Sequence, residues 1–295
     1  MDDFLMRSLM FVPGHNTRLL DSASRSVADL LLLDLEDSVQ PVENKQIARD
    51  TIKEYVENGR FEHFHVFPRI NDRESGQLLK DIGQLTIPGI DGFMYPKSHT
   101  GQDIYFIDKL LETIEYEKGV KMGTFKLIPL IETTAAVMNI QEICQASKRV
   151  VAVAFGCEDF VTDLHGVHDP DGSSIYTARS MIAMGARANN VIPIDTVHIK
   201  VHDLEDLEKN LKVAKILGFE GMLVLNPKEL PLVHSYFSPN TKEIQDAEEM
   251  LFLAKEAAAR GMGVAVKDNK FIGPPMVLKA KKILKKQELI KKRSK

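Results

Sequence analysis

Eight short apolar runs, rich in β-branched residues, recur between residues 8 and 225, and amphipathic segments separate them. Short apolar runs bounded by turn residues are typical of strands buried on both faces. The runs lie at 8–12, 30–35, 65–70, 92–95, 125–131, 151–155, 196–201 and 221–225. Apolar residues at helical spacing predict helices at 16–28, 41–58, 75–85, 102–118, 133–147, 175–190 and 204–217.

Strict alternation of strand and helix predicts a parallel sheet, and eight repeats favour closure into a barrel over an open sheet. No G-x-G-x-x-G follows the first run, which argues against a dinucleotide-binding fold. We therefore predict an α/β protein: a TIM-like (β/α)8 barrel at 1–240, with a C-terminal helical extension at 241–295.

The predicted extension contains a long helix at 241–260, a break at 261–263 and a final lysine-rich helix. The first of these helices has one apolar stripe, which includes Ile244, Ala247, Leu251 and Ala254. A stripe of this kind must be covered. We expect the extension to make contacts between subunits.

Composition narrows the class of protein. The chain has 295 residues, of which 44% are hydrophobic, so it is long enough to bury a large core. Cys144 and Cys157 form no C-x-x-C motif and predict no disulfide framework. The acidic start is unlike a signal peptide, and no apolar run approaches the roughly 18 residues of a membrane span. We expect a cytoplasmic protein with no membrane partner.

Charge is unevenly distributed along the chain, whose formal net charge is −4. From Lys279 to the end there are nine Lys or Arg and one acidic residue, Glu288. A basic tail can bind nucleic acid, but no aromatic residue interleaves these lysines as a base-stacking surface requires. We favour a solvated helix end and expect no nucleic-acid partner.

Carboxylates follow two neighbouring predicted strands. Glu132 comes directly after the fifth run, and Glu158 and Asp159 come shortly after the sixth. The carboxyl ends of barrel strands meet at the active-site face, and Mg²⁺ is usually bound there by one or two carboxylates. The pair Glu132 and Asp159 therefore predicts a metal site, although both residues could instead cap the helices that follow.

Further charged residues follow other strands. Asp34, Glu36 and Asp37 stand within four positions, more acids than strand termination or helix capping requires. Arg69 ends an apolar run, so its guanidinium must pair with a carboxylate of the protein or of a substrate, and the spacing leaves both open.

The signals in the remaining turns are weaker. Gly14 could turn the chain or let backbone amides approach an anion. Lys97 could bind substrate or extend into solvent. His165 and His168 lie in a loop whose residues 169–172 read Asp-Pro-Asp-Gly, which is more typical of a turn than of a metal site.

These residues lie within motifs that resemble the citrate lyase β-subunit family of the HpcH/HpaI aldolase superfamily. Residues 7–14 resemble its R-S-x-L-F-V-P-G opening, and residues 33–39 resemble its L-D-L-E-D-A-V. The further matches, in order, are R-[VI]-N at 69–71, P-K at 96–97, I-E-T at 131–133, A-F-G-x-E-D at 154–159, I-D-x-V at 194–197 and G-F-x-G at 218–221. The resemblance spans about residues 7–285.

The resemblance implies a Mg²⁺-dependent homotrimeric lyase. Such enzymes cleave citryl-, citramalyl- or malyl-type 3-hydroxyacyl thioesters of coenzyme A or an acyl carrier into an acyl thioester and a 2-oxo acid. By position, Glu132 and Asp159 are the implied metal ligands, and Glu132 also contacts substrate. Arg69 is the implied carboxylate-binding residue.

The resemblance also implies roles for residues around this centre. Glu36 and Asp37 would act with Arg69 in catalysis by orienting it and metal-bound water. Lys97 is expected to bind substrate, and Gly14 and Arg18 are expected near the coenzyme A moiety. The bidentate geometry of an arginine suits a carboxylate in a way that a lysine cannot reproduce.

Three positions depart from the family pattern. Gly273 stands where many of these lyases have the Asp of a C-terminal I-D-x-P, which acts as acid or base in a neighbouring subunit. Asn226 replaces the His of I-H-P, and Pro68 replaces a small apolar residue. Two alternatives therefore stay open: a divergent aldolase acting on a non-thioester 2-oxo-acid aldol, and a non-catalytic subunit that retains the barrel.

Overall fold

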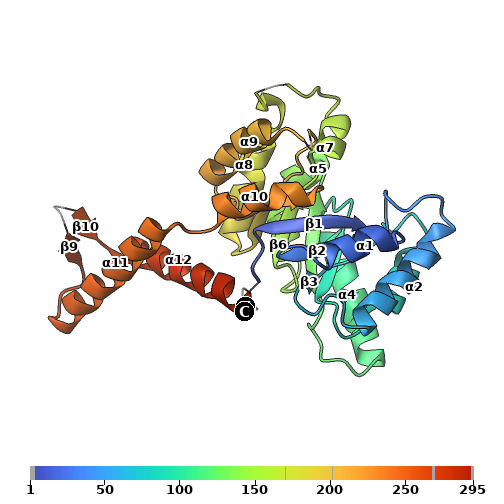
Figure 1. Ribbon diagram of the computed structural model, residues 1–295, viewed down its shortest axis with the longest axis horizontal. Coiled ribbons are helices and arrows are strands. Elements are labelled where there is room, and N and C mark those ends of the chain that lie inside the picture. Colours follow the sequence, from blue (N-terminus) through green and yellow to red (C-terminus); the bar gives the residue numbers. More distant parts are fainter. Residues whose placement is uncertain (1–3, 170, 201, 268–269, 294–295) are drawn as a thin grey trace. The chain divides into compact units, whose positions relative to one another are not determined.

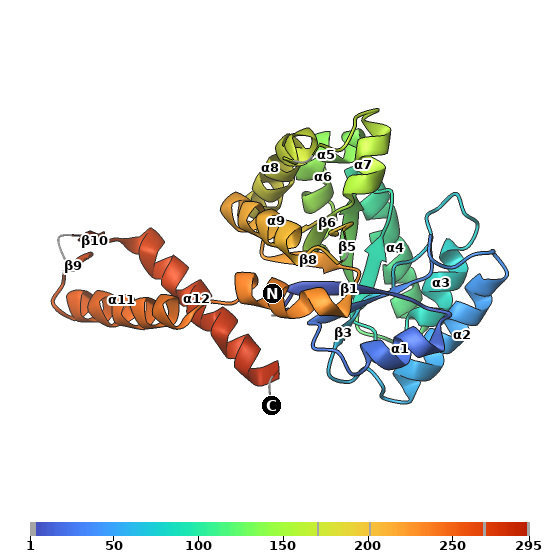
Figure 2. The ribbon, with the colours of Figure 1, turned by 45° about the horizontal axis from the view of Figure 1, so that its top comes forward.

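Eight parallel strands surround the core of the larger part of the chain in the computed structural model, and helices cover them (Figures 1 and 2). The structure describes residues 4–169, 171–200, 202–267 and 270–293. The chain divides into two compact units, Met6–His234 on one hand and Met1–Leu5 with Ser235–Lys295 on the other.

The strand order β3-β2-β1-β8-β7-β6-β5-β4 places β1 beside both β2 and β8, as in a barrel. The strands are β1 Ser8–Pro13, β2 Leu30–Asp34, β3 His65–Val66, β4 Gly92–Tyr95, β5 Lys126–Ile131, β6 Ala152–Phe155, β7 Ile192–Asp195 and β8 Gly221–Val224. Nearly every strand residue is buried, because the barrel interior covers one face and the helices cover the other. The predicted TIM-like α/β fold is confirmed.

Arg69 closes the barrel between β3 and β4. Pro68 has no N–H, and the regular part of the third strand ends at Val66. The backbone of Arg69 nevertheless bridges Asp34 on one side and Met94 on the other. The N–H of Arg69 donates to the Leu33 carbonyl at 3.0 Å, so pairing with β2 resumes at Arg69.

The helices of the barrel unit alternate with the strands. They are α1 Thr17–Ala23, α2 Asn44–Glu57, α3 Leu78–Leu85, α4 Gly101–Glu117, α5 Thr134–Met138, α6 Ile140–Gln145, α7 Cys157–Asp163, α8 Ser173–Ala188 and α9 Leu204–Leu217. After β8 come a 3₁₀ turn at Pro227–Glu229 and α10 Leu230–Phe237. The prediction that begins after the cap Asp203 and ends at Gly218 matches α9.

The seventh predicted strand, at 196–201, is wrong, and its last residue, Val201, lies outside the described residues. The strand is β7, which contains Pro193. Pro193 stands in register with Val153 of β6, whereas the register with β8 starts only at Ile194 opposite Gly221, so the missing N–H precedes the β8 ladder. A proline inside an apolar run therefore did not prevent a strand here.

Several predicted helices were too long. The helix predicted at 133–147 is two, because Asn139 leaves helical geometry and its side-chain amide donates to the His99 carbonyl at 3.0 Å. The helix predicted at 16–28 ends at Ala23, where Ser24 donates its hydroxyl to the Asp21 carbonyl. Serine and asparagine side chains compete with the helix for backbone groups in this way.

The second unit is built on two helices that pack against each other, α11 Thr241–Ala259 and α12 Pro274–Arg293. A hairpin of two antiparallel strands, β9 Ala265–Lys267 and β10 Lys270–Ile272, connects them (Figure 1). This hairpin was not predicted from the sequence. Ala257, Ala265 and Ile272 form a small core with Met250, Leu253 and Val277. No described helix is long and apolar enough to cross a membrane.

Arg179 of α8 forms a buried ion pair with Asp195 at the end of β7, with Nε 3.1 Å from Oδ1. We expect Arg179→Met to lower the free energy of unfolding by about 3–5 kcal/mol, because Asp195 would remain buried without its partner. Arg187→Met, on the same helix, breaks the more exposed pair with Glu220 and is expected to cost less than about 1 kcal/mol. Urea unfolding of both variants measures the difference. Equal losses in the free energy of unfolding would show that the buried pair stabilises the fold no more than the exposed one.

Candidate active site

A cavity of about 400 Å³ opens at the carboxyl ends of the strands. Its lining includes Pro13 at the end of β1, Asp34 at the end of β2, Glu132 after β5 and Asp159 after β6. Arg69 also lines it. The barrel thus brings together the carboxylates and the guanidinium that the sequence analysis assigned to one mouth.

Arg69 is bound on most of its polar edge by the protein's own carboxylates. Its Nε and Nη2 donate to the two oxygens of Asp34 at 2.6 and 2.8 Å, a bidentate pair. Its Nη1 lies 2.8 Å from Glu36 and 3.3 Å from Asp37. The guanidinium carbon also lies 4.9 Å from the centre of the Phe11 ring, within cation–π range.

These contacts set the protonation of the group. Burial acts to raise the pKa of Asp34, but the Arg69 guanidinium outweighs it and holds that pKa below its usual range. Burial raises the pKa of Glu36 to about 7, and the neighbouring Asp37 and Asp34 add to the rise. Arg69 therefore favours the ionised form of Asp34, whereas for Glu36 burial outweighs the opposing effect of Arg69 and disfavours the ionised form.

Glu132 is the most buried carboxylate that the sequence analysis assigned to the metal. Its side chain is almost inaccessible, and Oε1 accepts the backbone N–H of Lys97 at 2.6 Å. Burial raises the pKa of Glu132 to about 8, with further contributions from Glu36 and Asp159. Burial, and then the charge of Asp37, also raises the pKa of Asp159.

Lys97 holds Glu132 through an unusual backbone. Its φ of 49° lies in the left-handed region, which is uncommon for a residue with a side chain. This conformation directs its N–H toward Glu132, while its Nζ donates to Asp72 at 2.6 Å and lies 3.7 Å from Glu36. The lysine therefore contacts three acidic side chains, Glu132 through its backbone and both Asp72 and Glu36 through its side chain.

The donor set suits a divalent cation. Glu132 and Asp159 both have raised pKa values and face further carboxylates, a repulsion that a bound cation would relieve. No three His, Cys, Asp or Glu side chains form a metal-binding group within the described parts of the chain. Mg²⁺ is often bound through only one or two carboxylates, with water and substrate as the other ligands, so a two-carboxylate site fits it.

The two residues expected near coenzyme A differ in exposure, because Gly14 is buried and Arg18 is exposed. Gly14 donates its N–H to the Asp34 carbonyl at 2.9 Å, and a Cβ there would lie 2.7 Å from Ile52. Its lack of a side chain thus serves close packing. Arg18 is exposed on α1, next to Leu19, which lines the cavity.

The histidine loop that follows α7 shows contacts of a structural kind. Nε2 of His168 lies 3.1 Å from Glu158. Asp169 accepts hydrogen bonds from Ser173 and Ser174 at the start of α8. Pro170, in the middle of the Asp-Pro-Asp-Gly sequence, lies outside the described residues.

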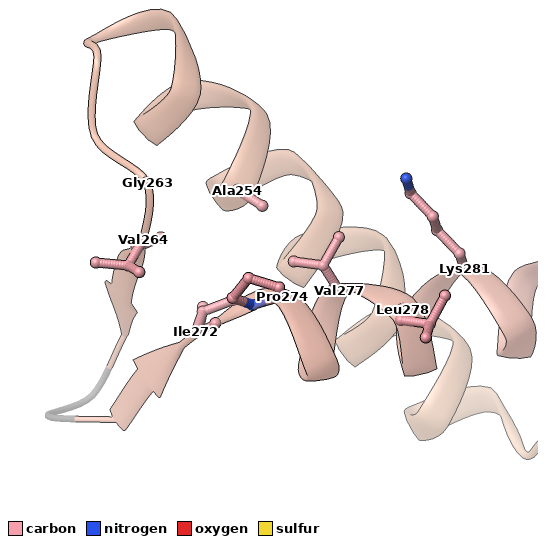
Figure 3. Close-up of a pocket in the computed structure, with 10 residues that line it drawn as sticks. Ala254, Gly263, Val264, Ile272, Pro274, Val277, Leu278 and Lys281 are labelled. Carbon is pink, nitrogen blue, oxygen red and sulfur yellow. The ribbon is translucent and has the colours of Figure 1, made fainter.

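A second cavity, of about 470 Å³, lies within the C-terminal unit between α11, the hairpin and α12 (Figure 3). Its described lining is mainly apolar and includes the charged Lys281. Gly273, which stands in place of the family's Asp, is part of this lining, so no carboxylate is present at that position.

Sequence reasoning missed several residues of the barrel cavity. Phe11, Leu130, Phe155 and Leu223 belong to apolar strand runs, and nothing in such a run separates a core side chain from one that lines a cavity. Gly156 was noted only as part of a motif. A Cβ at Gly156 would lie 2.8 Å from Cβ and 3.1 Å from Oε2 of Glu132, so its absence makes room for that carboxylate.

An α/β barrel with carboxylates at its strand ends has the architecture in which barrel enzymes place their active sites, here with a candidate metal centre. A profile of the HpcH/HpaI aldolase/citrate lyase family matches residues 7–227. The chain belongs to this family. It is 30% identical over 282 residues to the citrate lyase β subunit of Haemophilus influenzae, covering 96% of this chain and 97% of that one. It is 27% identical over 307 residues to the L-malyl-CoA/β-methylmalyl-CoA lyase of Rhodobacter capsulatus, covering 97% and 96%.

Solved structures share the fold. The CitE protein of Mycobacterium tuberculosis, solved with magnesium, acetoacetate and coenzyme A, superposes with a TM-score of 0.71 at 23% identity, covering 96% of this chain and 98% of that one. A citrate lyase of Burkholderia xenovorans LB400 superposes with a TM-score of 0.81 at 17% identity, covering 98% and 93%.

Gly156→Ala tests whether the missing side chain makes room for Glu132. Its φ of −98° is open to alanine, so the cost comes from the contact with Glu132, and we expect a loss of about 1–3 kcal/mol in the free energy of unfolding. Gly83→Ala in α3 is the matched control, because no atom lies within 4 Å of its Cβ position. It should be neutral or stabilising by up to about 1 kcal/mol. Equal stability of both variants in urea unfolding would contradict this account.

Proposed function

We propose that this protein is a Mg²⁺-dependent carbon–carbon lyase that cleaves a 3-hydroxyacyl thioester of the citryl, citramalyl or malyl type. The products are an acyl thioester and a 2-oxo acid. The observation that carries the proposal is that Glu132 and Asp159, from adjacent strand ends, line one cavity with Arg69. Membership of the family and the magnesium in related solved structures support it.

Glu132 and Asp159 would hold the cation, and Lys97 and Gly156 would keep Glu132 in position for it. When bound, Mg²⁺ supplies Lewis-acid stabilisation of negative charge on the oxygens of the oxo-acid half. In the cleavage, the bond between the α and β carbons of the acyl chain breaks, and the β-hydroxyl loses its proton as it becomes the carbonyl. The electron pair passes to the thioester enolate, which takes up a proton at its α carbon.

Arg69 would bind the carboxylate of the oxo acid. Its position in the cavity and its charge support this role, and Asp34 fixes the plane of its guanidinium. Glu36 and Asp37 contact Nη1 and would keep it oriented between turnovers. The thioester would enter beside α1, where Arg18 is exposed, and its carrier would be coenzyme A or an acyl carrier.

Glu132→Gln tests the metal site. A neutral amide is a poorer ligand for a hard cation, so we expect Mn²⁺ affinity to fall by about 100-fold or more, with turnover falling in parallel. Glu158→Gln removes a neighbouring, exposed carboxylate of the same cavity and should have a much smaller effect. Electron paramagnetic resonance of Mn²⁺ titrations measures both. Full activity after treatment with a chelator would contradict the metal requirement.

Gly273 favours a second candidate function. Without a carboxylate at this position, the chain lacks the Asp that acts as acid or base on the thioester enolate in many of these lyases. A divergent aldolase that acts on a non-thioester 2-oxo-acid aldol is therefore the alternative. A non-catalytic subunit is the third. A cleavage screen with Mg²⁺ that offers thioester and non-thioester aldols and detects pyruvate, glyoxylate and oxaloacetate separates the three. Cleavage of a thioester supports the lyase, cleavage of a free aldol alone supports the aldolase, and no cleavage supports the non-catalytic subunit.

We expect weak cleavage of citramalyl- and malyl-CoA by the natural sequence and a gain with Gly273→Asp, because general acid–base catalysis contributes about 10²–10⁴-fold. A Cβ at Gly273 would lie 2.4 Å from Cε1 of Phe271, whose ring is 60% exposed and can move aside. Steady-state kinetics on both thioesters is the measurement. Cleavage by the unmodified protein at about 10 s⁻¹, a typical enzyme turnover, would show that another residue performs this role.

We further propose that the protein is a homo-oligomer, most simply a trimer, with contacts made by the C-terminal unit. Large apolar side chains on that unit are exposed, among them Phe252, Val266 and Leu278. The resemblance to homotrimeric lyases gives the number of subunits, so light scattering at micromolar concentration should give a mass near three chains. A monomer under these conditions would overturn this part of the proposal.

A further inference from the structure

The described lining of the barrel cavity is strongly acidic. Arg69 is the one basic residue among these described residues, whereas Asp34, Glu132, Glu158 and Asp159 are acidic. The guanidinium is already paired with Asp34 and lies 2.8 Å from Glu36. A bound Mg²⁺ and Arg69 could together neutralise one substrate carboxylate, but no further residue of the described lining offers positive charge to a second one. Lys97 lies outside this lining, and its Nζ is paired with Asp72.

Most of the remaining side chains of the cavity wall are apolar. They come from four strands and from the loops that follow β7 and β8, namely Phe11, Leu130, Phe155, Val197, Leu223 and Leu225. Two polar side chains also line it, but the Ser38 hydroxyl already donates to Asp34 and the Cys157 thiol to Glu158. The Phe11 ring lies 4.9 Å from the guanidinium carbon of Arg69, so apolar surface begins directly beside the cation. A group attached next to a carboxylate bound by Arg69 would therefore meet carbon atoms or acidic oxygens.

The energetic consequences differ sharply for the two kinds of substituent. A second carboxylate would lose hydration without gaining a partner, and it would be repelled by the acidic side chains. A methyl or ethyl group would gain from burial, by about fourfold in affinity for each carbon.

We propose that the 2-oxo acid bound in this cavity carries one carboxylate and a small apolar substituent, as in pyruvate or 2-oxobutyrate, and no second carboxylate as in oxaloacetate. The inference rests on the proposed function and narrows the substrate class of the same site. It selects a substrate whose hydroxyl-bearing carbon also carries an alkyl group.

Calorimetric binding of four oxo acids to the full chain in saturating Mg²⁺ tests the inference without requiring turnover. Pyruvate and 2-oxobutyrate should bind at least about tenfold more tightly than freshly prepared oxaloacetate, which would place an unpaired charge in the cavity. Pyruvate and 2-oxobutyrate should also bind at least about fourfold more tightly than glyoxylate, which lacks the alkyl group.

Each other result decides a different point. Oxaloacetate binding as tightly as pyruvate would overturn this inference and leave the proposed lyase function standing. Binding of none of the four acids in the presence of Mg²⁺ would overturn the proposed function and the inference with it.

A pair of matched variants locates the discrimination. Leu225 is 44% exposed and lines the cavity, whereas Leu164 is 43% exposed and lies outside that lining. Leu225→Arg should raise the affinity for oxaloacetate relative to pyruvate by about tenfold or more, because the new cation can form a charge-assisted hydrogen bond. Leu164→Arg changes the net charge equally and should leave the ratio unchanged. An unchanged affinity ratio in Leu225→Arg would overturn the argument from the apolar wall. The binding series of the natural protein tests the inference independently of both variants.

Discussion

The ion pair between Arg69 and Asp34 connects the closure of the barrel to the formation of its cavity. The backbone of Arg69 joins β2 to β4 just after Pro68 has interrupted the third strand. Its side chain then takes both oxygens of Asp34, whose backbone pairs with the end of β1. Breaking a buried pair of this kind leaves an uncompensated charge and is strongly destabilising. The same two residues therefore hold the barrel closed and fix a guanidinium at its mouth.

Around this pair the fold concentrates carboxyl groups that its own cations neutralise only in part. Glu36, Glu132 and Asp159 all have raised pKa values because burial and neighbouring carboxylates disfavour their ionised forms. Packing maintains this unfavourable arrangement, since the left-handed backbone of Lys97 and the bare backbone of Gly156 leave Glu132 little freedom. Strain and repulsion that persist at one place in a fold are typical of a functional site. A divalent cation would convert this repulsion into binding free energy.

The sequence was sufficient to predict the barrel and most of its charged mouth, because apolar runs mark buried strands and charged residues at their ends stand out. It failed where local pattern and tertiary context differ. Pro193 masked β7, although pairing with β8 begins one residue later. Asn139 divides a continuous helical pattern through a bond to His99, which is distant in sequence. The contact of Phe11 with Arg69 had no local signal either, because Phe11 lies within an apolar run that looks the same whether its side chains face the core or the cavity.

The spatial pairing of Arg69 with Asp34 was equally hidden, since spacing alone left a protein or a substrate carboxylate as its partner. The structure adds the protein partner, and the proposed function requires a metal beside it. Anomalous scattering from crystals soaked with Mn²⁺ tests that central claim most directly. The account predicts a peak at the carboxyl ends of β5 and β6, within bonding distance of both Glu132 and Asp159. A well-occupied Mn²⁺ elsewhere in the molecule, with no peak between these two carboxylates, would contradict it.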